Sequence, residues 1–330
     1  INTIKELSYT GYGSNYKFGL GTGDCPVFPE MHEVSRLIVG GALEGIKRIQ
    51  SGEVTQAFSL LGGLHHAFES RAAGFCYYND PVIAIKHLQQ EYGLERILYI
   101  DTDVHHGDGV LYTFYESEKV LGISIHQSGY YIFPGTGFPK EIGKKKGLGY
   151  SINIPLVPGT WDDLYIQMFE EIIPCLWEKF DPEFIVWQCG ADGHFRDLLG
   201  SLNLTTNLYH FLGKRISELS KKSSAKGKLL LLGGGGYNPD SVARVWLAEL
   251  LGITGITISD ESPQEWINFC KQKYNIDVSK KLADPKIDFK NVDPRGSIRD
   301  ENRRYLQELK NELKQIEAWK SCYHFFERTI

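Results

Sequence analysis

A short stretch of the chain, residues 99–110, concentrates acids and histidines directly after an apolar run. Its sequence is YIDTDVHHGDGV, in which the acids are Asp101, Asp103 and Asp108 and the histidines are His105 and His106. An isolated carboxylate is costly to bury, so a segment of this kind needs a metal ion, a histidine partner or both.

Alternation along a strand would place Asp101, Asp103 and His105 in line on one face. Two carboxylates at that distance repel each other unless a cation or a protonated base separates them. A mixed Asp and His site with open coordination positions suits Zn²⁺ or Fe²⁺ held for catalysis. The alternative interpretation is a partly solvated loop with salt bridges.

A second adjacent histidine pair, His65 and His66, lies in the segment GGLHHAF. An aspartate that accepts a hydrogen bond from one imidazole nitrogen fixes the tautomer and raises the basicity of the other nitrogen. Two histidine pairs with aspartates available are therefore typical of acid–base catalysis.

Two further segments extend the candidate site. Asp192, in QCGADGHF, follows an apolar run and is a candidate third metal ligand, although aspartate is also common in turns and helix caps. Tyr237 follows four glycines in GGGGYNP, and glycine lets the backbone approach other groups closely. A tyrosine held there could donate its hydroxyl to a developing oxyanion, although the motif alone is more often a turn.

Apolar runs rich in β-formers alternate with amphipathic segments. Strands are predicted over residues 96–101, 120–125, 151–156, 184–190 and 228–234. Helices are predicted over residues 31–51, 80–92, 162–180, 205–221 and 239–251. This alternation predicts an α/β fold with a central, mainly parallel sheet and helices on both faces. Function gathers at the carboxyl ends of the strands in such sheets, and the charged and glycine-rich segments stand there.

Composition excludes several classes of protein. The net charge is −5, from 36 basic and 41 acidic residues, which argues against a nucleic-acid surface. The apolar runs are too short to span a membrane, and the first residues show no signal-peptide pattern. The six cysteines form no C-x-x-C pair or disulfide pattern, which favours a reducing cytoplasm. Residues 300–320 predict a charged surface helix.

Together these segments resemble the histone deacetylase and acetoin-utilisation protein family, and most closely its bacterial and archaeal members. The resembling segments, in family order, are GDCPVF (23–28), GGLHHAFESRAAGFCYYND (62–80), RILYIDTDVHHGDGV (96–110), SIHQSGYYIFPGTG (124–137), QCGADGHFRDLLGSLNLT (188–205) and LLGGGGYNPDSVARVW (231–246). The resemblance implies one deacetylase domain of the arginase–deacetylase fold over residues 1–330. The family's opening strand has no counterpart before Gly23, and His194 and Phe195 replace the small or aliphatic residues of eukaryotic members.

The resemblance also implies a role for individual residues. The catalytic metal, Zn²⁺ or Fe²⁺, would be held by Asp103, His105 and Asp192. His66 with Asp108 would act as general base and acid, His65 with Asp101 would orient and stabilise electrostatically, and Tyr237 would bind the substrate carbonyl.

The remaining implied residues form the substrate site and two potassium sites. The substrate would contact Asp24 at the rim, Gly74 through its carbonyl, Phe75 and Phe133 along an apolar channel, and Leu199 at the mouth. Structural K⁺ would be bound by carbonyls of Asp101, Asp103 and His105 with Ser124, and at a second site near Phe114, Val120 and Tyr150.

The predicted function is hydrolysis of the acetyl amide of acetylated lysine in proteins or peptides. Deacetylation of a small acetylated amine, such as an acetylpolyamine, is the nearest alternative, but it would favour an acidic residue in place of Leu199. A two-metal ureohydrolase would need a second aspartate two places after Asp192, and a non-catalytic binding protein would have lost metal ligands or Tyr237. The physiological substrate and the oligomeric state stay open.

Overall fold

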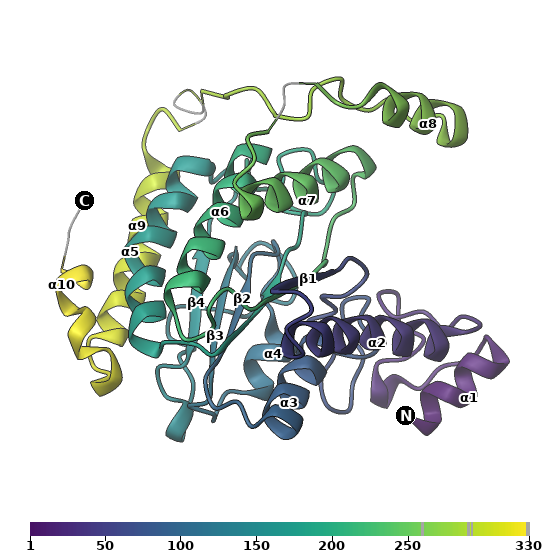
Figure 1. Cartoon of the computed structure of the whole chain (residues 1–330), viewed down its shortest axis with the longest axis horizontal. Helices are drawn as coiled ribbons and strands as arrows, with labels where there is room; N and C mark the ends of the chain where they lie inside the picture. Colours follow the sequence, from purple (N-terminus) through teal and green to yellow (C-terminus); the bar gives the residue numbers. More distant parts are fainter. Residues whose placement is uncertain (259–260, 289–290, 292, 328–330) are drawn as a thin grey trace.

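The computed structural model describes residues 1–258, 261–288, 291 and 293–327 (Figure 1). The described strands form one parallel sheet in the order β1-β6-β5-β2-β3-β4. The strands are β1 (Gln56–Ser59), β2 (Ile97–Asp101), β3 (Val120–Gln127), β4 (Ser151–Leu156), β5 (Phe184–Gln188) and β6 (Leu229–Leu232). The predicted α/β fold is confirmed, with β1 as a strand that the prediction missed.

Helices cover both faces of the sheet (Figure 1). The helices are α1 (Asn2–Thr10), α2 (Met31–Gln50), α3 (Asp80–Tyr92), α4 (Asp108–Thr113), α5 (Asp162–Phe180), α6 (Thr206–Lys222), α7 (Pro239–Thr254), α8 (Gln264–Tyr274), α9 (Ser297–Leu313) and α10 (Tyr323–Phe326). Buried side chains of α2, α3 and α4 form one apolar cluster with the sheet, and those of α5, α6, α7 and α9 form another. Among the described helices, none is both long enough and apolar enough to cross a membrane.

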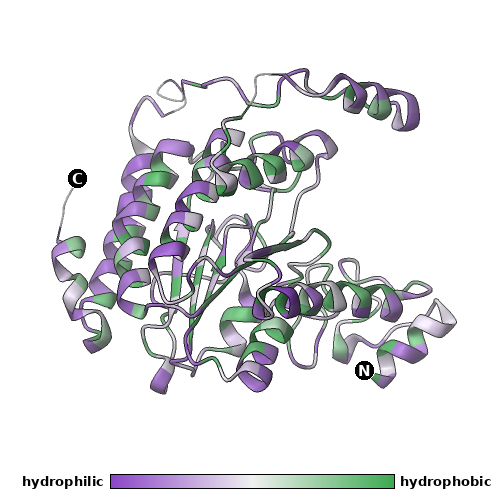
Figure 2. Ribbon diagram, viewed as in Figure 1, coloured by the Kyte–Doolittle hydropathy of each residue, from purple (hydrophilic) through white to green (hydrophobic). Residues whose placement is uncertain are grey.

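The central strands contribute side chains to both clusters because neighbouring side chains point to opposite faces. In β2, Leu98 and Ile100 enter one cluster, whereas Ile97 and Tyr99 enter the other. A parallel sheet covered on both faces needs such continuous apolar runs. In Figure 2 the helices α5, α6 and α9 alternate purple and green, since only one side of each contacts the core.

Two asparagine caps place helices beside the functional loops. The side chain of Asn79 accepts a hydrogen bond from the backbone N–H of Val82 at the start of α3, and its amide donates to the carbonyls of His65 and Ala67. Asn238 caps α7 in the same way, one residue after Tyr237. The caps therefore join the helix starts to the segments that carry the candidate catalytic residues.

The C-terminal helix differs from its prediction. It spans Ser297–Leu313, and a short 3₁₀ helix, η4 (Glu317–Cys322), follows it. Its buried side chains include Tyr305, Leu306, Leu309 and Leu313. The surface helix predicted over 300–320 is therefore wrong in its end, since the helix stops at Leu313; one apolar side packs against the core while the charged side faces outward.

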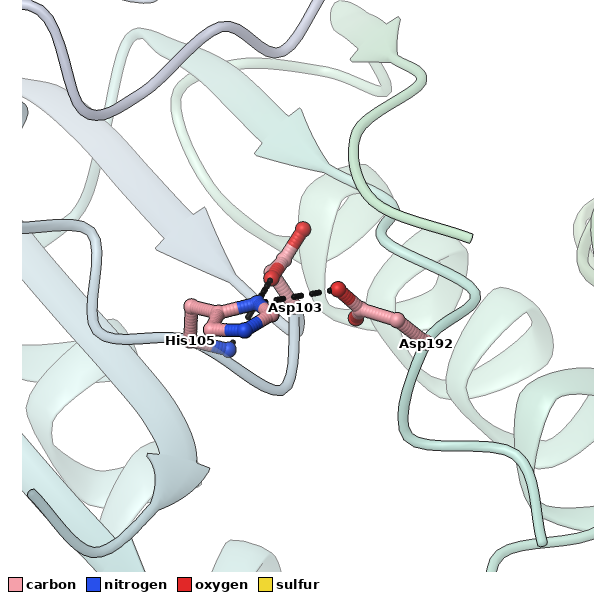
Figure 3. Close-up of side chains that lie close together, drawn as sticks. All are labelled: Asp103, His105 and Asp192. Carbon is pink, nitrogen blue, oxygen red and sulfur yellow. Dashed lines mark hydrogen bonds and ion pairs between the residues drawn. The ribbon is translucent and has the colours of Figure 1, made fainter. Parts of the chain in front are cut away.

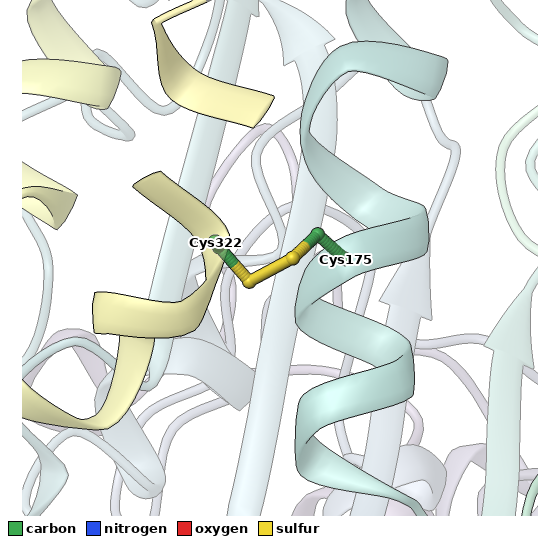
Figure 4. The surroundings of a disulfide bond; sticks show 2 residues. All are labelled: Cys175 and Cys322. Carbon is green, nitrogen blue, oxygen red and sulfur yellow. A yellow bond between two sulfur atoms is a disulfide. The ribbon is translucent and has the colours of Figure 1, made fainter. Parts of the chain in front are cut away.

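A disulfide joins Cys175 on α5 to Cys322 in the C-terminal segment (Figure 4). The expectation of reduced cysteines is wrong for this pair, because the two lie 147 positions apart in the sequence and no local pattern indicates the bond. Four other cysteines are free and buried: Cys25, Cys76, Cys189 and Cys270.

Candidate metal centre and active site

Two loops at the carboxyl end of the sheet bring together three possible metal ligands. Asp103 and His105 follow β2, and Asp192 follows β5; their side chains converge in Figure 3. The Nδ1 atom of His105 lies 3.1 Å from Asp103 Oδ1 and 3.0 Å from Asp192 Oδ2. All three residues are buried, and one potential ligand atom of each lies within 4.8 Å of the others. Two carboxylates and one imidazole are a donor set that fits a divalent cation such as Zn²⁺ or Fe²⁺.

Neighbouring groups hold the two carboxylates in place. Asp103 Oδ2 accepts hydrogen bonds of 2.8 Å from Gln188 Nε2 and from the backbone N–H of Gly235, and Asp192 Oδ1 accepts one of 2.8 Å from the N–H of Val104. A Cβ atom at Gly235 would lie 1.9 Å from Asp192 Oδ2, so the glycine run is required for this close approach. The prediction missed Gln188, whose signal is a polar residue ending the apolar strand FIVWQ.

The electrostatics of this group suit a cation. Burial and the charge of Asp103 raise the pKa of Asp192 to about 7. Burial opposes protonation of His105, but its hydrogen bonds to Asp103 and Asp192 outweigh it and raise the pKa of His105 to about 10. The two buried carboxylates therefore hold a positive charge between them.

His65 and His66, in the segment between β1 and α3, each pair with a different aspartate. Nδ1 of His65 lies 2.8 Å from Asp101 Oδ2, and Nδ1 of His66 lies 2.7 Å from Asp108 Oδ1. A carboxylate only accepts, so each Nδ1 donates, which leaves Nε2 as the second functional nitrogen. Asp101 also accepts a 2.5 Å hydrogen bond from the hydroxyl of Tyr99, a residue that the prediction missed although it lies two places earlier on β2.

These paired histidines have opposite protonation at neutral pH. Burial disfavours the charged form of His65, but Asp101 and Asp103 outweigh this and raise its pKa to about 9. Burial and the positive charge of His65 lower the pKa of His66 to about 4. His65 is thus a cation and His66 a neutral base.

A pocket of about 320 Å³ opens above these groups. It is lined by Asp24, His66, Gly74, Phe75, His105, Ile132, Phe133, Leu199 and Tyr237. All five predicted substrate residues line it, and Ile132 is an addition. A larger cavity of about 500 Å³ lies beside α1 and includes none of these residues.

Gly74 is constrained by the pocket wall. Its φ is +54°, and a Cβ atom there would lie 2.4 Å from the His66 ring and 2.9 Å from Phe133. The backbone N–H of Gly74 donates a 2.7 Å hydrogen bond to Asp24 Oδ2, which orients this turn. A side chain at position 74 would therefore close the passage between Phe133 and His66.

Tyr237 reaches the pocket from the loop after β6. Its backbone N–H donates a 2.7 Å hydrogen bond to Asp197 Oδ2, and its ring contacts Phe75 at a centroid distance of 6.1 Å. Burial, with the charges of Asp103 and Asp192, raises the pKa of the Tyr237 hydroxyl above its ordinary value. The hydroxyl is therefore a hydrogen-bond donor at neutral pH. The prediction missed Asp197.

Comparison with known proteins agrees with this geometry. The family model for the histone deacetylase domain matches residues 1–253. The chain belongs to the histone deacetylase family. The acetoin utilization protein AcuC of Bacillus subtilis (strain 168) is 42% identical over 273 residues, which cover 81% of this chain and 69% of that protein. AcuC of Staphylococcus xylosus is 37% identical over 313 residues, 94% of this chain and 81% of that protein.

The solved structures give the same answer for the fold. The crystal structure of a histone deacetylase homologue complexed with SAHA aligns with a TM-score of 0.82 and 33% identity, covering 93% of this chain and 82% of that chain. The single parallel sheet with helices on both faces is therefore the arginase–deacetylase fold that the resemblance implied.

The residues expected to bind potassium in this deacetylase-family chain lie in two groups. Ser124 is the register partner of Asp101, and its hydroxyl lies 2.8 Å from His126 Nδ1. Phe114, Val120 and Tyr150 line a separate small hollow of about 10 Å³. The residues predicted for the two potassium sites therefore lie in two separate places.

Proposed function

We propose that this histone deacetylase family member hydrolyses the acetyl amide of acetylated lysine side chains in proteins or peptides. The observation that carries the proposal is one pocket lined by a metal ligand, His105, the neutral base His66 and the donor Tyr237. Phe75 and Phe133 make its wall apolar, which suits the methylene stem of a lysine whose polar end is buried.

We assign a catalytic divalent cation, Zn²⁺ or Fe²⁺, to Asp103, His105 and Asp192. When bound, the ion would polarise the amide carbonyl and acidify a water molecule. The carbonyl would become a better electrophile and the water a better nucleophile. Two carboxylates and one imidazole accept either metal.

We assign the proton transfers to the dyad of His66 and Asp108, and an electrostatic role to the dyad of His65 and Asp101. His66 Nε2 accepts a proton from the attacking water, while Asp108 holds Nδ1–H and stabilises the imidazolium that forms. His66 then returns the proton to the nitrogen of the leaving lysine. The cation of His65, held by Asp101, adds positive charge beside the carbonyl where negative charge develops.

Tyr237 stabilises the same developing charge from the other side. Its hydroxyl stays protonated, so it donates a hydrogen bond to the carbonyl oxygen as that oxygen becomes negative. The bond to Asp197 fixes the backbone from which the ring reaches into the pocket.

We also propose two structural K⁺ sites. The first would use carbonyl oxygens of Asp101, Asp103 and His105 with Ser124, and the second would lie near Phe114, Val120 and Tyr150. Carbonyl oxygens are ligands that can replace the hydration shell of K⁺.

A small acetylated amine is the second candidate substrate. Leu199 lies at the pocket and is 44% exposed, so its apolar side chain offers nothing to a second ammonium group. An acidic residue there would attract such a cation, and its absence favours acetyl-lysine.

The test is turnover by metal-stripped protein reconstituted with Zn²⁺ or Fe²⁺. We expect kcat/KM to be higher on acetyl-lysine peptides than on acetylated polyamines, and Leu199→Glu to shift the ratio toward polyamines. Asp192→Ala is the control that removes a metal ligand. Absence of turnover on every acetylated substrate with either metal would refute the proposal, and a preference for polyamines would favour the second candidate.

A further inference from the structure

Residues 279–284 lie beyond residues 1–253 that the family model matches, on the segment that runs from α8 to α9 (Figure 1). They nevertheless contact both loops that carry the chemistry. We infer that Asp284 is a positioning residue, which holds the loop of Asp192 and the loop of Tyr237 in the arrangement that binds the metal and the substrate.

The Asp284 carboxylate joins three elements. Its Oδ2 atom accepts hydrogen bonds from His194 Nε2 at 2.8 Å and from the backbone N–H of Thr206 at 2.9 Å. Its Oδ1 atom accepts one of 2.7 Å from Arg244 Nη1 on α7. Asp284, His194 and Arg244 are 7%, 1% and 2% exposed, so each would be costly to leave without its partner.

His194 links Asp284 to the loop that carries the candidate metal ligand Asp192. Its Nδ1 accepts a hydrogen bond from the backbone N–H of Arg196, so Nε2 carries the hydrogen that Asp284 accepts. The backbone of His194 donates to the carbonyl of Ala191 and accepts from the N–H of Asp197. The ring thus fixes a turn that has Asp192 at one end and Asp197 at the other.

The same segment reaches Tyr237 by two routes. Asp197 accepts hydrogen bonds from the backbone N–H groups of Tyr237 at 2.7 Å and Leu199 at 2.9 Å. Asp240, three residues after Tyr237, pairs with Arg244 and accepts a 2.9 Å hydrogen bond from the N–H of Ser279. Both the oxyanion donor and the pocket mouth therefore depend on residues 279–284.

Asp284→Asn is the direct test. In asparagine an NH₂ group, which donates, replaces one of the two carboxylate oxygens. That group must lie against Arg244 or against His194 and Thr206, and all of these are donors too. Groups that orient metal ligands contribute about 10-fold to 100-fold in metal affinity or activity, so we expect Zn²⁺ affinity and kcat to fall about 10-fold or more with KM nearly unchanged. Zn²⁺ affinity is measured by competition with a chromophoric chelator, and kcat and KM on an acetyl-lysine peptide.

Glu171→Gln is the matched control, because Glu171 pairs with buried Lys310 between α5 and α9 at 2.5 Å. We expect it to lower the Tm while leaving Zn²⁺ affinity and kcat as in the wild type. Wild-type Zn²⁺ affinity in Asp284→Asn, or equal losses in both variants at equal Tm, would overturn the inference.

A pair of substitutions at His194 decides the matter if Asp284→Asn does not fold. Glutamine keeps a donor near the position of Nε2, so His194→Gln should recover most of the Zn²⁺ affinity that His194→Ala loses. Equal affinities in the two variants would contradict a positioning role. The inference rests on the proposed function only for the choice of substrate: failure of wild-type protein to deacetylate would refute that function, whereas Zn²⁺ affinity would still test Asp284.

Discussion

His65 and His66 carry the same imidazole on adjacent residues, yet the fold gives them different charges. His65 lies against Asp101 and near Asp103, so it stays protonated, with a pKa of about 9. His66 is buried beside that cation, so its pKa of about 4 leaves it neutral. Separating two pKa values in this way supplies a fixed charge and a free base from one dipeptide.

The pH dependence of activity follows from His66. Its neutral form is the proposed base, so kcat/KM should hold as the pH falls from 7 and decrease as it approaches about 4, where His66 takes up a proton. His65→Gln removes the neighbouring positive charge, which raises the pKa of His66 and moves this decrease to higher pH. Profiles of kcat/KM against pH for the two proteins check the prediction, and an identical acid limb in both would contradict it.

Removing either of two proposed catalytic groups, the oxyanion donor Tyr237 or the base His66, should slow the chemical step. Tyr237→Phe keeps the ring but loses the oxyanion donor, and His66→Ala loses the base; each should lower kcat by about 10²-fold or more. Metal content and Tm should stay near wild type. Turnover close to that of the wild type in either variant would rule out its assigned role.

At the scale of elements, the sequence predicted most strands and helices because their apolar patterns are local. β2 through β6 and α2, α3, α5, α6 and α7 lie within a few residues of their predicted bounds. β1 is a strand of four residues with the sequence QAFS, too short and too weakly apolar to register as a pattern.

Some residues of the candidate site could likewise be predicted from the sequence, and others could not. The motifs around His65, Asp101 and Tyr237 each stand within a few residues, so chemistry could be assigned to them from the sequence. The partner of His194 is 90 residues away, and only the folded chain shows that Asp284 lies beside it. Gln188 and Tyr99 end or line apolar strands, where a single polar group does not reveal which carboxylate it meets.

The disulfide gives a prediction at this scale. Cys175 and Cys322 lie 147 positions apart in the sequence, and a cross-link of that span restricts the unfolded chain, so Cys322→Ser should lower the free energy of unfolding by about 2–5 kcal/mol. Urea denaturation with and without a thiol reductant measures this. Equal stability of the wild type and the variant under oxidising conditions would mean that the bond contributes nothing.

At the scale of the whole molecule, most buried polar groups in the described part of the chain have hydrogen-bond partners, but a few do not. Glu249 on α7 is fully buried, and among the described residues its carboxyl oxygens have no hydrogen-bond partner. Burial raises the pKa of Glu249 well above its ordinary 4.5, so the folded protein keeps this carboxyl protonated after the unfolded chain has released its proton.

The stability should therefore decrease with rising pH through this group. The contribution is fully present below pH 4.5 and is lost by about 1.4 kcal/mol per pH unit until the folded pKa is reached. Glu249→Gln cannot ionise, so its stability relative to the wild type should increase between pH 5 and 8, as measured by urea denaturation at each pH. A constant difference across this range would show that Glu249 is not protonated in the folded state.

The strand order has a consequence for how the protein is made. In the described sheet β1 pairs with β6, the last strand of the sheet to be synthesised, and β6 also separates β1 from β5. The histidine pair after β1 therefore cannot take its place until the ribosome has passed residue 232, and Gly235 closes over Asp103 later still. A chain that has not yet been made past residue 235 therefore lacks the arrangement of histidines on which the proposed hydrolysis depends, although Asp103, His105 and Asp192 have all been made by then.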